Sequence, residues 1–192
     1  MVELTEARLT IPEAAFVSGL TVRDINREID AGIISVGGRS GRKLRGADLF
    51  YLFAVKEVRN QLDPALRKSM RKAIVDAAAA RRREARVHHF VFLIEGIRQD
   101  LLGPFEALER TRDDHIESRK DILGGEPVIK RTRIAARHVA DLVKRGATRT
   151  EIGDDLDLTD AQIEAALLFD RTSPRRGRPP ARKDRTVHVP AA

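Results

Sequence analysis

The sequence has no cysteine and no tryptophan among its 192 residues, and it has only seven phenylalanines and one tyrosine. The lack of cysteine excludes disulfide bonds, thiolate zinc sites, iron–sulfur clusters and a cysteine nucleophile. No apolar run is long enough to span a bilayer, and the first twenty residues lack the basic start and apolar centre of a secretory signal. We therefore expect a cytoplasmic protein without membrane association, built from small helical units.

Charged residues, by contrast, are abundant. They make up 34% of the chain, whereas charged residues usually make up about a quarter of a soluble protein. The net charge is +7. Residues 64–86 carry eight basic and two acidic residues, and residues 171–192 carry seven basic and one acidic residue. Residues 87–170 are acidic, with twelve basic and seventeen acidic residues. This segregation predicts a polyanionic partner for the basic segments and other tasks for the rest.

The spacing of capping residues, glycines and charged runs predicts a mainly α fold with small β elements. We expect a winged helix-turn-helix at residues 1–62 and a spacer of basic helix, β-hairpin and helix at residues 63–118. A three-helix domain of helix-turn-helix shape should follow at residues 119–170. An Arg/Pro-rich tail at residues 171–192 lacks a core pattern and should be disordered alone.

The first segment predicts two short helices joined by a glycine turn. Capping-box spacing begins them at Thr10 and Thr21, and glycines end them at Gly19 and Gly32. The second helix should bury a face with i, i+3, i+7 spacing, made of Val22, Ile25 and Ile29. Arginine and asparagine on its other side offer paired hydrogen bonds to guanine and adenine. The candidate DNA-binding residues of this helix are Thr21, Arg23, Asn26 and Arg27.

A basic loop follows that helix. Residues 33–36 predict a short strand, and residues 37–45 predict a glycine turn and a return strand. Such a loop can lie along a phosphate backbone, so its candidate DNA-binding residues are Arg39, Ser40, Arg42, Lys43 and Arg45. Asp48 should cap a third helix to about Leu62, whose apolar side would be Leu49, Leu52, Phe53, Val55 and Val58.

Residues 8–60 resemble the DNA-binding domains of the MerR-like and excisionase-like families. The resembling pattern consists of residues 10–15, 20–27, 32–34, the basic loop and residues 44–53. The resemblance implies a winged helix-turn-helix that binds operator DNA as a homodimer. The alternative is a helical hairpin with solvated charge.

The spacer should begin with a basic helix from Asp63-Pro64 to about Arg86, with an apolar stripe of Leu66, Met70, Ala73, Ile74 and Ala77. Its basic residues are either a solvated face or further phosphate contacts: Arg67, Lys68, Arg71, Lys72 and Arg81 to Arg83. Residues 87–94 have strong strand character, and residues 97–102 could return as a second strand. Gly103-Pro104 should end that strand before a charged helix at residues 105–116.

Three histidines could suggest a metal site. His88 and His89 are adjacent, and adjacent residues of a strand point to opposite faces, so they do not easily share one ion. His115 has no carboxylate at a recognised ligand spacing. The chain also has no phosphate-binding loop. We expect no metal, no cofactor, no catalytic residues and no enzymatic activity.

The next segment predicts a glycine turn and short strand, followed by three helices. The first helix should span residues 136–145 and end at Gly146, and Thr148 should cap the second. The third should run from about Leu158 to Asp170, with Ile163, Ala166, Leu167 and Phe169 as its apolar positions. Residues 157–170 contain four acidic residues and no basic residue. Phosphate would repel such a helix, so it favours protein contact, including dimerisation.

Residues 119–170 resemble a small family of domains found in VapB-type antitoxins. The shared pattern lies at residues 124–130, 132–134, 145–148 and 158–167. The resemblance implies an antitoxin that binds and inhibits a PIN-like ribonuclease toxin of the VapC type and represses its own operon. Two positions depart from the family: Arg131 replaces a usual glycine and Ala135 a frequent proline. The turn at Arg131 must therefore avoid positive φ or accept strain.

Two basic sets remain open in role. Lys130, Arg131, Arg133 and Arg137 could contact DNA or a partner, or form a solvated surface. Residues 176–180 resemble the core of an AT-hook, which lays arginines in the minor groove. Antitoxins of the resembling class commonly cover the toxin with a tail, whose arginines could pair with metal-binding carboxylates. The candidate toxin-binding residues are Arg175, Arg176, Arg178, Arg182 and Lys183. The alternative function is a stand-alone regulator without a toxin.

Overall fold

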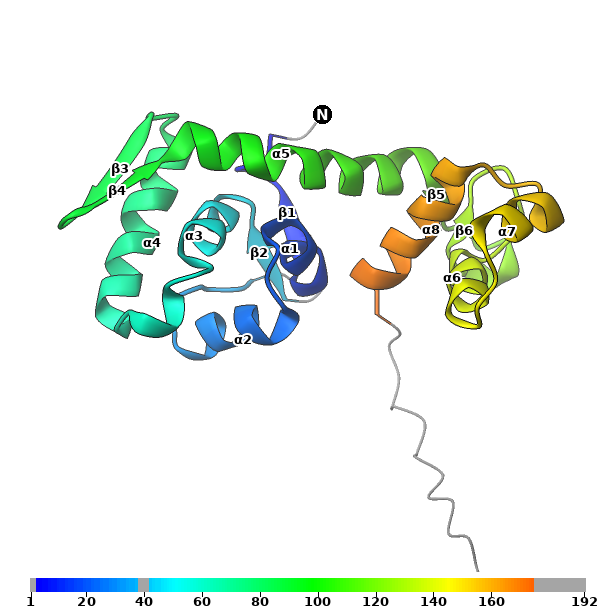
Figure 1. The fold of residues 1–192 in the computed structure, drawn as a ribbon, viewed down its shortest axis with the longest axis horizontal. Helices are drawn as coiled ribbons and strands as arrows, with labels where there is room; N and C mark the ends of the chain where they lie inside the picture. The colour runs from blue at the N-terminus through cyan, green and yellow to red at the C-terminus, as the bar shows by residue number, and fades with distance from the viewer. Residues whose placement is uncertain (1–2, 38–41, 175–192) are drawn as a thin grey trace, which may run out of the picture.

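The computed structural model describes residues 3–37 and 42–174, which form eight α-helices and three two-stranded antiparallel sheets (Figure 1). The helices are α1 (Ile11–Ser18), α2 (Val22–Asp30), α3 (Ala47–Val55), α4 (Pro64–Ala79), α5 (Ile94–Arg110), α6 (Ala136–Lys144), α7 (Arg149–Leu156) and α8 (Asp160–Thr172). The paired strands are β1 (Arg8–Thr10) with β2 (Lys43–Arg45), β3 (Glu84–Val87) with β4 (Phe90–Leu93), and β5 (Ile116–Glu117) with β6 (Val128–Ile129). The expectation of a mainly helical protein with small β elements is confirmed.

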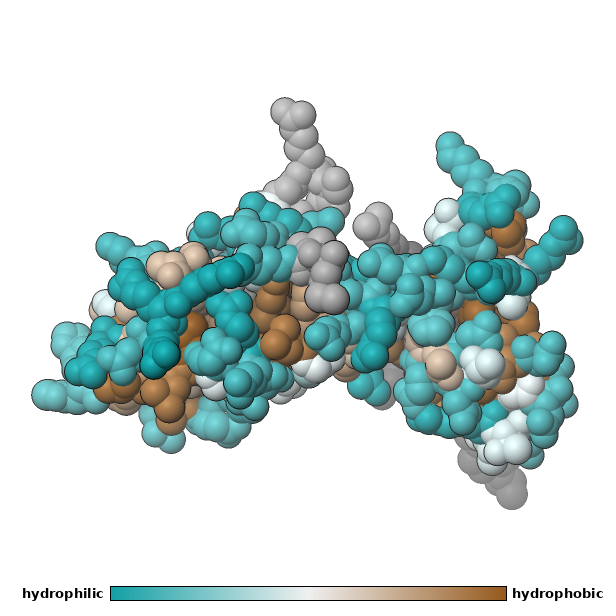
Figure 2. All heavy atoms as spheres, turned by 90° about the horizontal axis from the view of Figure 1, so that it is seen from above, coloured by the Kyte–Doolittle hydropathy of each residue, from teal (hydrophilic) through white to brown (hydrophobic). Residues whose placement is uncertain are grey.

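The described residues pack around two hydrophobic cores. One core contains residues between Leu4 and Leu108, and we call this part, residues 3–110, the larger lobe. The other contains residues between Ile116 and Ala166, and we call residues 116–174 the smaller lobe. Helix α5 lies along the larger lobe and leads into a π-helical turn at Thr111–His115, which joins the lobes. Figure 2 shows the two lobes separated by a narrower waist.

The observed helix starts agree closely with the starts predicted from the sequence. The Glu13 carboxylate accepts a 2.7 Å hydrogen bond from the Thr10 amide, and capping boxes also begin α2, α7 and α8. The glycines that follow α1, α2 and α6 have positive φ, as a left-handed cap requires. The predicted bounds of these helices are confirmed to within a few residues.

Helix α3 is buried on nearly all sides, because α1, α4 and α5 surround it. The single apolar side that we predicted was too narrow, since Phe50 and Tyr51 are also fully buried. The predicted cap residue Asp48 is instead a buried acid that pairs with Arg71 of α4 at 2.6 Å. The helix ends at Val55, so Val58 lies outside it and is 39% exposed.

The expected strand at residues 33–36 does not form. The amides of Ile33 and Ile34 both donate to the carbonyl of Glu28, at 2.9 and 3.2 Å, so they belong to the end of α2. Strand β2 therefore pairs with β1 over three residues. Among the described residues of the predicted loop, an isolated bridge between Gly37 and Lys43 joins its two sides.

The spacer differs from the sequence prediction in two places. Helix α4 ends at Ala79, and residues 84–93 form a complete hairpin, β3–β4, which turns at His88 and His89. Residues 97–102, predicted as a strand, belong to α5, which continues through Pro104 to Arg110. Proline lacks the amide for the bond to residue 100. Burial of Leu101, Phe105 and Leu108, at helical spacing, holds the helix together across that gap.

In the smaller lobe α8 contacts β5 and packs against α6 and α7, and the three helices share one apolar core with Ile116 of β5 and Ile129 of β6. Ile163 and Ala166 of α8 are fully buried there, as predicted. Arg131, at the position where the resembling family usually has glycine, has φ +64°, so the turn adopts the strained left-handed conformation. An ion pair of 2.5 Å between Glu13 of α1 and Arg112 of the π-helical turn fixes the larger lobe to this junction.

Candidate nucleic-acid interface

Helix α2 lies on the side of the larger lobe opposite α5 (Figure 1). Its inward residues are Ile25 and Glu28, both fully buried, and its outward residues include Arg23 and Arg27. Asn26 is half-buried, so it is less available for contact than predicted. Val22, predicted as buried, is 43% exposed because it lies in the first turn, beyond the core.

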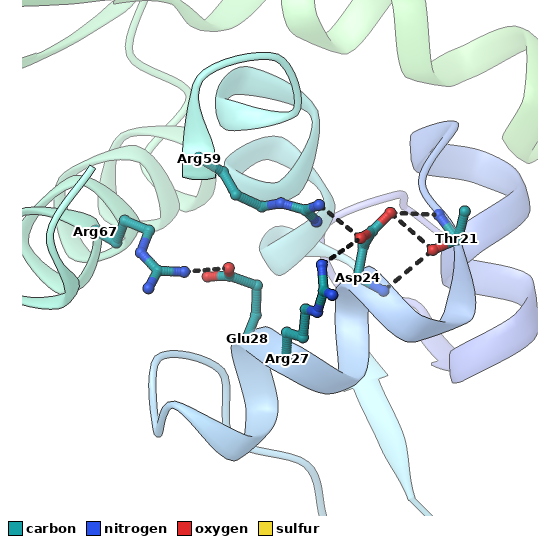
Figure 3. A network of polar contacts seen from close by, with 6 residues as sticks. All are labelled: Thr21, Asp24, Arg27, Glu28, Arg59 and Arg67. Atoms are coloured by element: carbon teal, nitrogen blue, oxygen red, sulfur yellow. Dashed lines mark hydrogen bonds and ion pairs between the residues drawn. The ribbon is translucent and has the colours of Figure 1, made fainter. Parts of the chain in front are cut away.

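The inner side of α2 is held by an ionic network (Figure 3). The Asp24 carboxylate accepts hydrogen bonds from the Thr21 hydroxyl at 2.7 Å and from Arg59 at 2.6 Å. The Thr21 hydroxyl, followed by Arg59, lowers the pKa of Asp24, although partial burial acts in the opposite direction. Arg27 lies 3.7 Å from the same carboxylate and keeps 53% of its side chain exposed. Thr21 therefore has a structural role in the helix start as well as an exposed position.

A second contact fixes the end of α2. The buried Glu28 carboxylate accepts a hydrogen bond from the Tyr51 hydroxyl at 2.8 Å and pairs with Arg67 of α4 at 2.5 Å. Burial, followed by the bond to Glu28, raises the pKa of Tyr51 far above its ordinary value. Both ends of α2 are thus joined to the core by charge-assisted hydrogen bonds, which are stronger than neutral ones.

These contacts change the assignment of the basic helix. Arg67 and Arg71 of α4 pair with buried carboxylates, so they are neither a solvated face nor free phosphate contacts. Lys68 and Lys72 are exposed. The sequence could not show this, because Glu28 and Arg67 are 39 positions apart.

The β1–β2 pair adds a basic strand face. Arg8 lies opposite Arg45, and Thr10 lies opposite Lys43. Residues opposite one another share a face, and Leu9 and Leu44 on the other face are fully buried. Arg8 and Arg45 are exposed, and Lys43 is half-buried. Arg8 was missed from sequence because the pairing of β1 with β2 was not foreseen.

The remaining predicted residues fall into two groups. Arg42 is exposed just before β2. Arg39 and Ser40 of the loop lie outside the described residues, as do the candidate toxin-binding residues Arg175, Arg176, Arg178, Arg182 and Lys183.

In the smaller lobe, the basic residues whose role the sequence left open differ in their contacts. The Arg137 guanidinium lies 5.9 Å from the ring centroid of Phe169 and donates to the carbonyl of Ser173 at 2.9 Å, so it holds α8 against α6. Arg131 and Arg133 are exposed. On α8, Glu164 pairs with Arg149 of α7, and Asp170 pairs with Lys144 of α6.

Two further properties bear on the class of protein. No group of three or more histidines, aspartates or glutamates in residues 3–37 and 42–174 is arranged to hold a metal ion. No helix in the described part of the chain has the length and apolar character needed to cross a membrane.

The fold and the surface together define a two-lobed, mainly helical protein with a basic helix-and-strand surface on its larger lobe. Residues 116–169, the core of the smaller lobe, match the family DUF433, described as a protein of unknown function. The chain is 31% identical over 185 residues to the uncharacterized protein y4eO of Sinorhizobium fredii (strain NBRC 101917 / NGR234), covering 88% of this chain and 83% of that protein. It belongs to the same family as y4eO. No solved structure matches it significantly.

Proposed function

We propose that this protein binds DNA through α2 and the basic face of β1–β2. The observation that supports this most directly is the division of α2 into two sides. Asp24 and Glu28 tie one side to the core, while Arg23 and Arg27 are exposed on the other. A rigidly held helix with exposed arginines suits base contact in a major groove.

In this proposal the larger lobe contains a winged helix-turn-helix, in which α1 and α2 are the two helices and α2 enters the groove. The exposed arginines of the strand face, Arg8 and Arg45, contact phosphates beside it. The buried ion pairs support this function indirectly, because they fix the orientation of α2 before DNA arrives.

We further propose that the protein is an antitoxin that represses its own operon and inhibits a PIN-like ribonuclease. The resemblance of the smaller lobe to domains of VapB-type antitoxins supports this role. The arginine-rich residues 175–192 would contact the toxin, and the acidic α8 would contact protein rather than DNA. The alternative is a regulator without a toxin partner, and neither role requires enzymatic activity.

DNA binding can be tested by selection from a random duplex pool, because the operator is unknown. The full-length protein should enrich one motif, and fluorescence anisotropy should show tighter binding to that motif than to a scrambled duplex. Specific binding typically exceeds nonspecific binding by about 10³-fold or more. Equal affinity for both duplexes, or no binding at low salt, would contradict the proposal.

The toxin proposal needs a separate experiment. The tagged protein, expressed together with its neighbouring genes, should co-purify with a stoichiometric small ribonuclease that mass spectrometry identifies. A variant that ends at Pro174, just beyond α8, should lose inhibition of that ribonuclease and keep DNA binding. A protein that binds its motif but recovers no such partner would be a stand-alone regulator.

A further inference from the structure

The β3–β4 hairpin lies at the end of the larger lobe and extends away from the smaller lobe (Figure 1). Strand β4 is unusually apolar for such a position: Phe90 is 40%, Val91 52% and Leu93 67% exposed. Figure 2 shows apolar side chains gathered over this end of the lobe. An exposed apolar strand at a sheet edge is a template for pairing with another strand.

The backbone of β4 is also open for pairing. Val87 faces Phe90 across the two-residue turn, and Ala85 faces Phe92. The Ile94 amide donates to the Arg83 carbonyl at 2.9 Å. Hydrogen-bonded and non-bonded pairs alternate in an antiparallel ladder, so the bond at Ile94 makes Phe92 and Phe90 the hydrogen-bonded residues of β4. Val91 and Leu93 lie between them and direct their amides away from β3. The amide and carbonyl of Val91 and the amide of Leu93 therefore point to the free edge, where no described strand pairs with them.

Beside this edge lies a groove of about 390 Å³. Its floor includes Phe53 and Ala54 of α3 and Ile97 of α5, and Glu57 and Asp100 belong to its lining. An added strand would thus gain main-chain hydrogen bonds from β4 and apolar contact with the groove.

We propose that the occupant is a second copy of this chain, which pairs its own β4 antiparallel to this one. Val91 lies opposite Val91 of the second copy, and a four-stranded sheet results. A two-fold interface uses the same patch on both copies, and this edge satisfies that condition. Phe90 then faces Phe92 of the second copy on the side of the groove, and Leu93 faces His89.

Charge complementarity favours this arrangement over pairing with an unrelated strand. The register places the hairpin tip of the second copy, with Arg86, His88 and His89, beside the start of α5. The exposed acidic residues there are Asp100 and Glu95, and Glu95 lies 3.8 Å from Arg98 of the same helix. Arg86 lies 2.8 Å from Glu84 of its own strand and still keeps 70% of its side chain exposed. Two-fold symmetry repeats this contact of basic tip and acidic helix start, and complementary charges help to fix register. The dimer forms without DNA, so this proposal can be tested independently of DNA binding.

The natural lack of cysteine makes a direct test possible. In a hydrogen-bonded antiparallel pair the Cα atoms are about 5.5 Å apart, which a disulfide can bridge. The full-length Val91→Cys variant, under mild oxidation without DNA, should form a covalent dimer in high yield. The matched control is Leu123→Cys, a single cysteine at an exposed leucine of the smaller lobe, which should remain largely unlinked.

Light scattering gives the second measurement. The wild-type protein should have the mass of a dimer at micromolar concentration, and Leu93→Lys should dissociate it at least tenfold more readily. The dissociated Leu93→Lys monomer should still show the circular dichroism and the cooperative thermal unfolding of a folded protein, because Leu93 is mostly exposed. The Leu123→Lys control should remain a dimer. The proposal is wrong if the wild type is a monomer, if Leu93→Lys leaves a dimer intact, or if Val91→Cys cross-links no better than Leu123→Cys.

Discussion

The guanidinium of Arg59 lies 2.6 Å from the carboxylate of Asp24 and thereby joins the start of α2 to the short helical turn before α4. The Arg59 side chain is only 6% exposed, so water screens this contact weakly. Glu28 and Arg67 make the corresponding contact at the other end of α2. The exposed arginines of α2 therefore belong to a helix whose position is fixed by the Asp24–Arg59 and Glu28–Arg67 ion pairs.

The Glu28→Ala variant tests this anchoring. It leaves the Arg67 guanidinium and the Tyr51 hydroxyl without their buried partner. Breaking a buried pair from one side is costly, so the free energy of unfolding should fall by about 3 kcal/mol. Urea denaturation measures this loss. Asp30→Ala, at an exposed acid of the same helix, should change stability by no more than about 0.5 kcal/mol. Equal effects of the two substitutions would show that Glu28 does not hold α2.

Acid should weaken the contact at Asp24. The pKa of this carboxyl is lowered in the folded protein, chiefly by the Thr21 hydroxyl and then by Arg59. The folded carboxyl thus binds a proton less readily than the unfolded one. Its stabilising contribution is complete above about pH 4 and is lost as the pH falls through the lower folded pKa.

The Asp24→Asn variant isolates that contribution. It should be less stable than wild type at neutral pH, and the difference should shrink as the pH is lowered from about 5 to about 2. Denaturation at several pH values measures both curves. A difference that stays constant over this range would contradict the assignment.

The strain at Arg131 predicts a stabilising substitution. A residue with a Cβ at φ +64° costs about 1–2 kcal/mol that glycine does not. Arg131→Gly should therefore raise the free energy of unfolding of the smaller lobe by about 0.5–1 kcal/mol, after the greater chain entropy of unfolded glycine is allowed for. Arg133→Gly is the control, because Arg133 is exposed without positive φ and should gain nothing. Thermal unfolding compares them, and a loss of stability in Arg131→Gly would refute the strain.

The strand face predicts a salt effect. Arg8 and Arg45 lie opposite each other as like charges, an arrangement that is unfavourable in the free protein. If they contact phosphates, Arg45→Ala should weaken binding to selected and scrambled duplexes alike. It should also reduce the slope of log affinity against log salt by about 1. Arg149→Ala, at an arginine of the smaller lobe whose side chain is 52% exposed, should leave the slope unchanged. Equal slopes in all three proteins would remove the strand face from the interface.

Features set by residues close together in the sequence could be predicted, whereas contacts between distant segments could not. Helix starts at Thr10, Thr21 and Thr148 were predictable, because a cap and its partner are three residues apart. Residues 87–94 were predicted as one strand, because the apolar run does not reveal a turn at His88, whose φ is +51°. The pairing of β1 with β2 and the Glu28–Arg67 contact join distant segments, so local patterns carry no sign of them.

The central claim is that α2 contacts base edges, and Arg27 tests it most directly. Arg27→Ala should weaken binding to the selected duplex by about 1–3 kcal/mol and relax the preference at one base position, with little change on scrambled DNA. Arg119→Ala is the matched control, because Arg119 is 57% exposed and also pairs with an aspartate, but lies in the smaller lobe. Fluorescence anisotropy at fixed salt should show loss of specificity for Arg27→Ala alone. An equal loss on selected and scrambled duplexes would make Arg27 a phosphate contact, and no loss at all would place the DNA elsewhere on the protein.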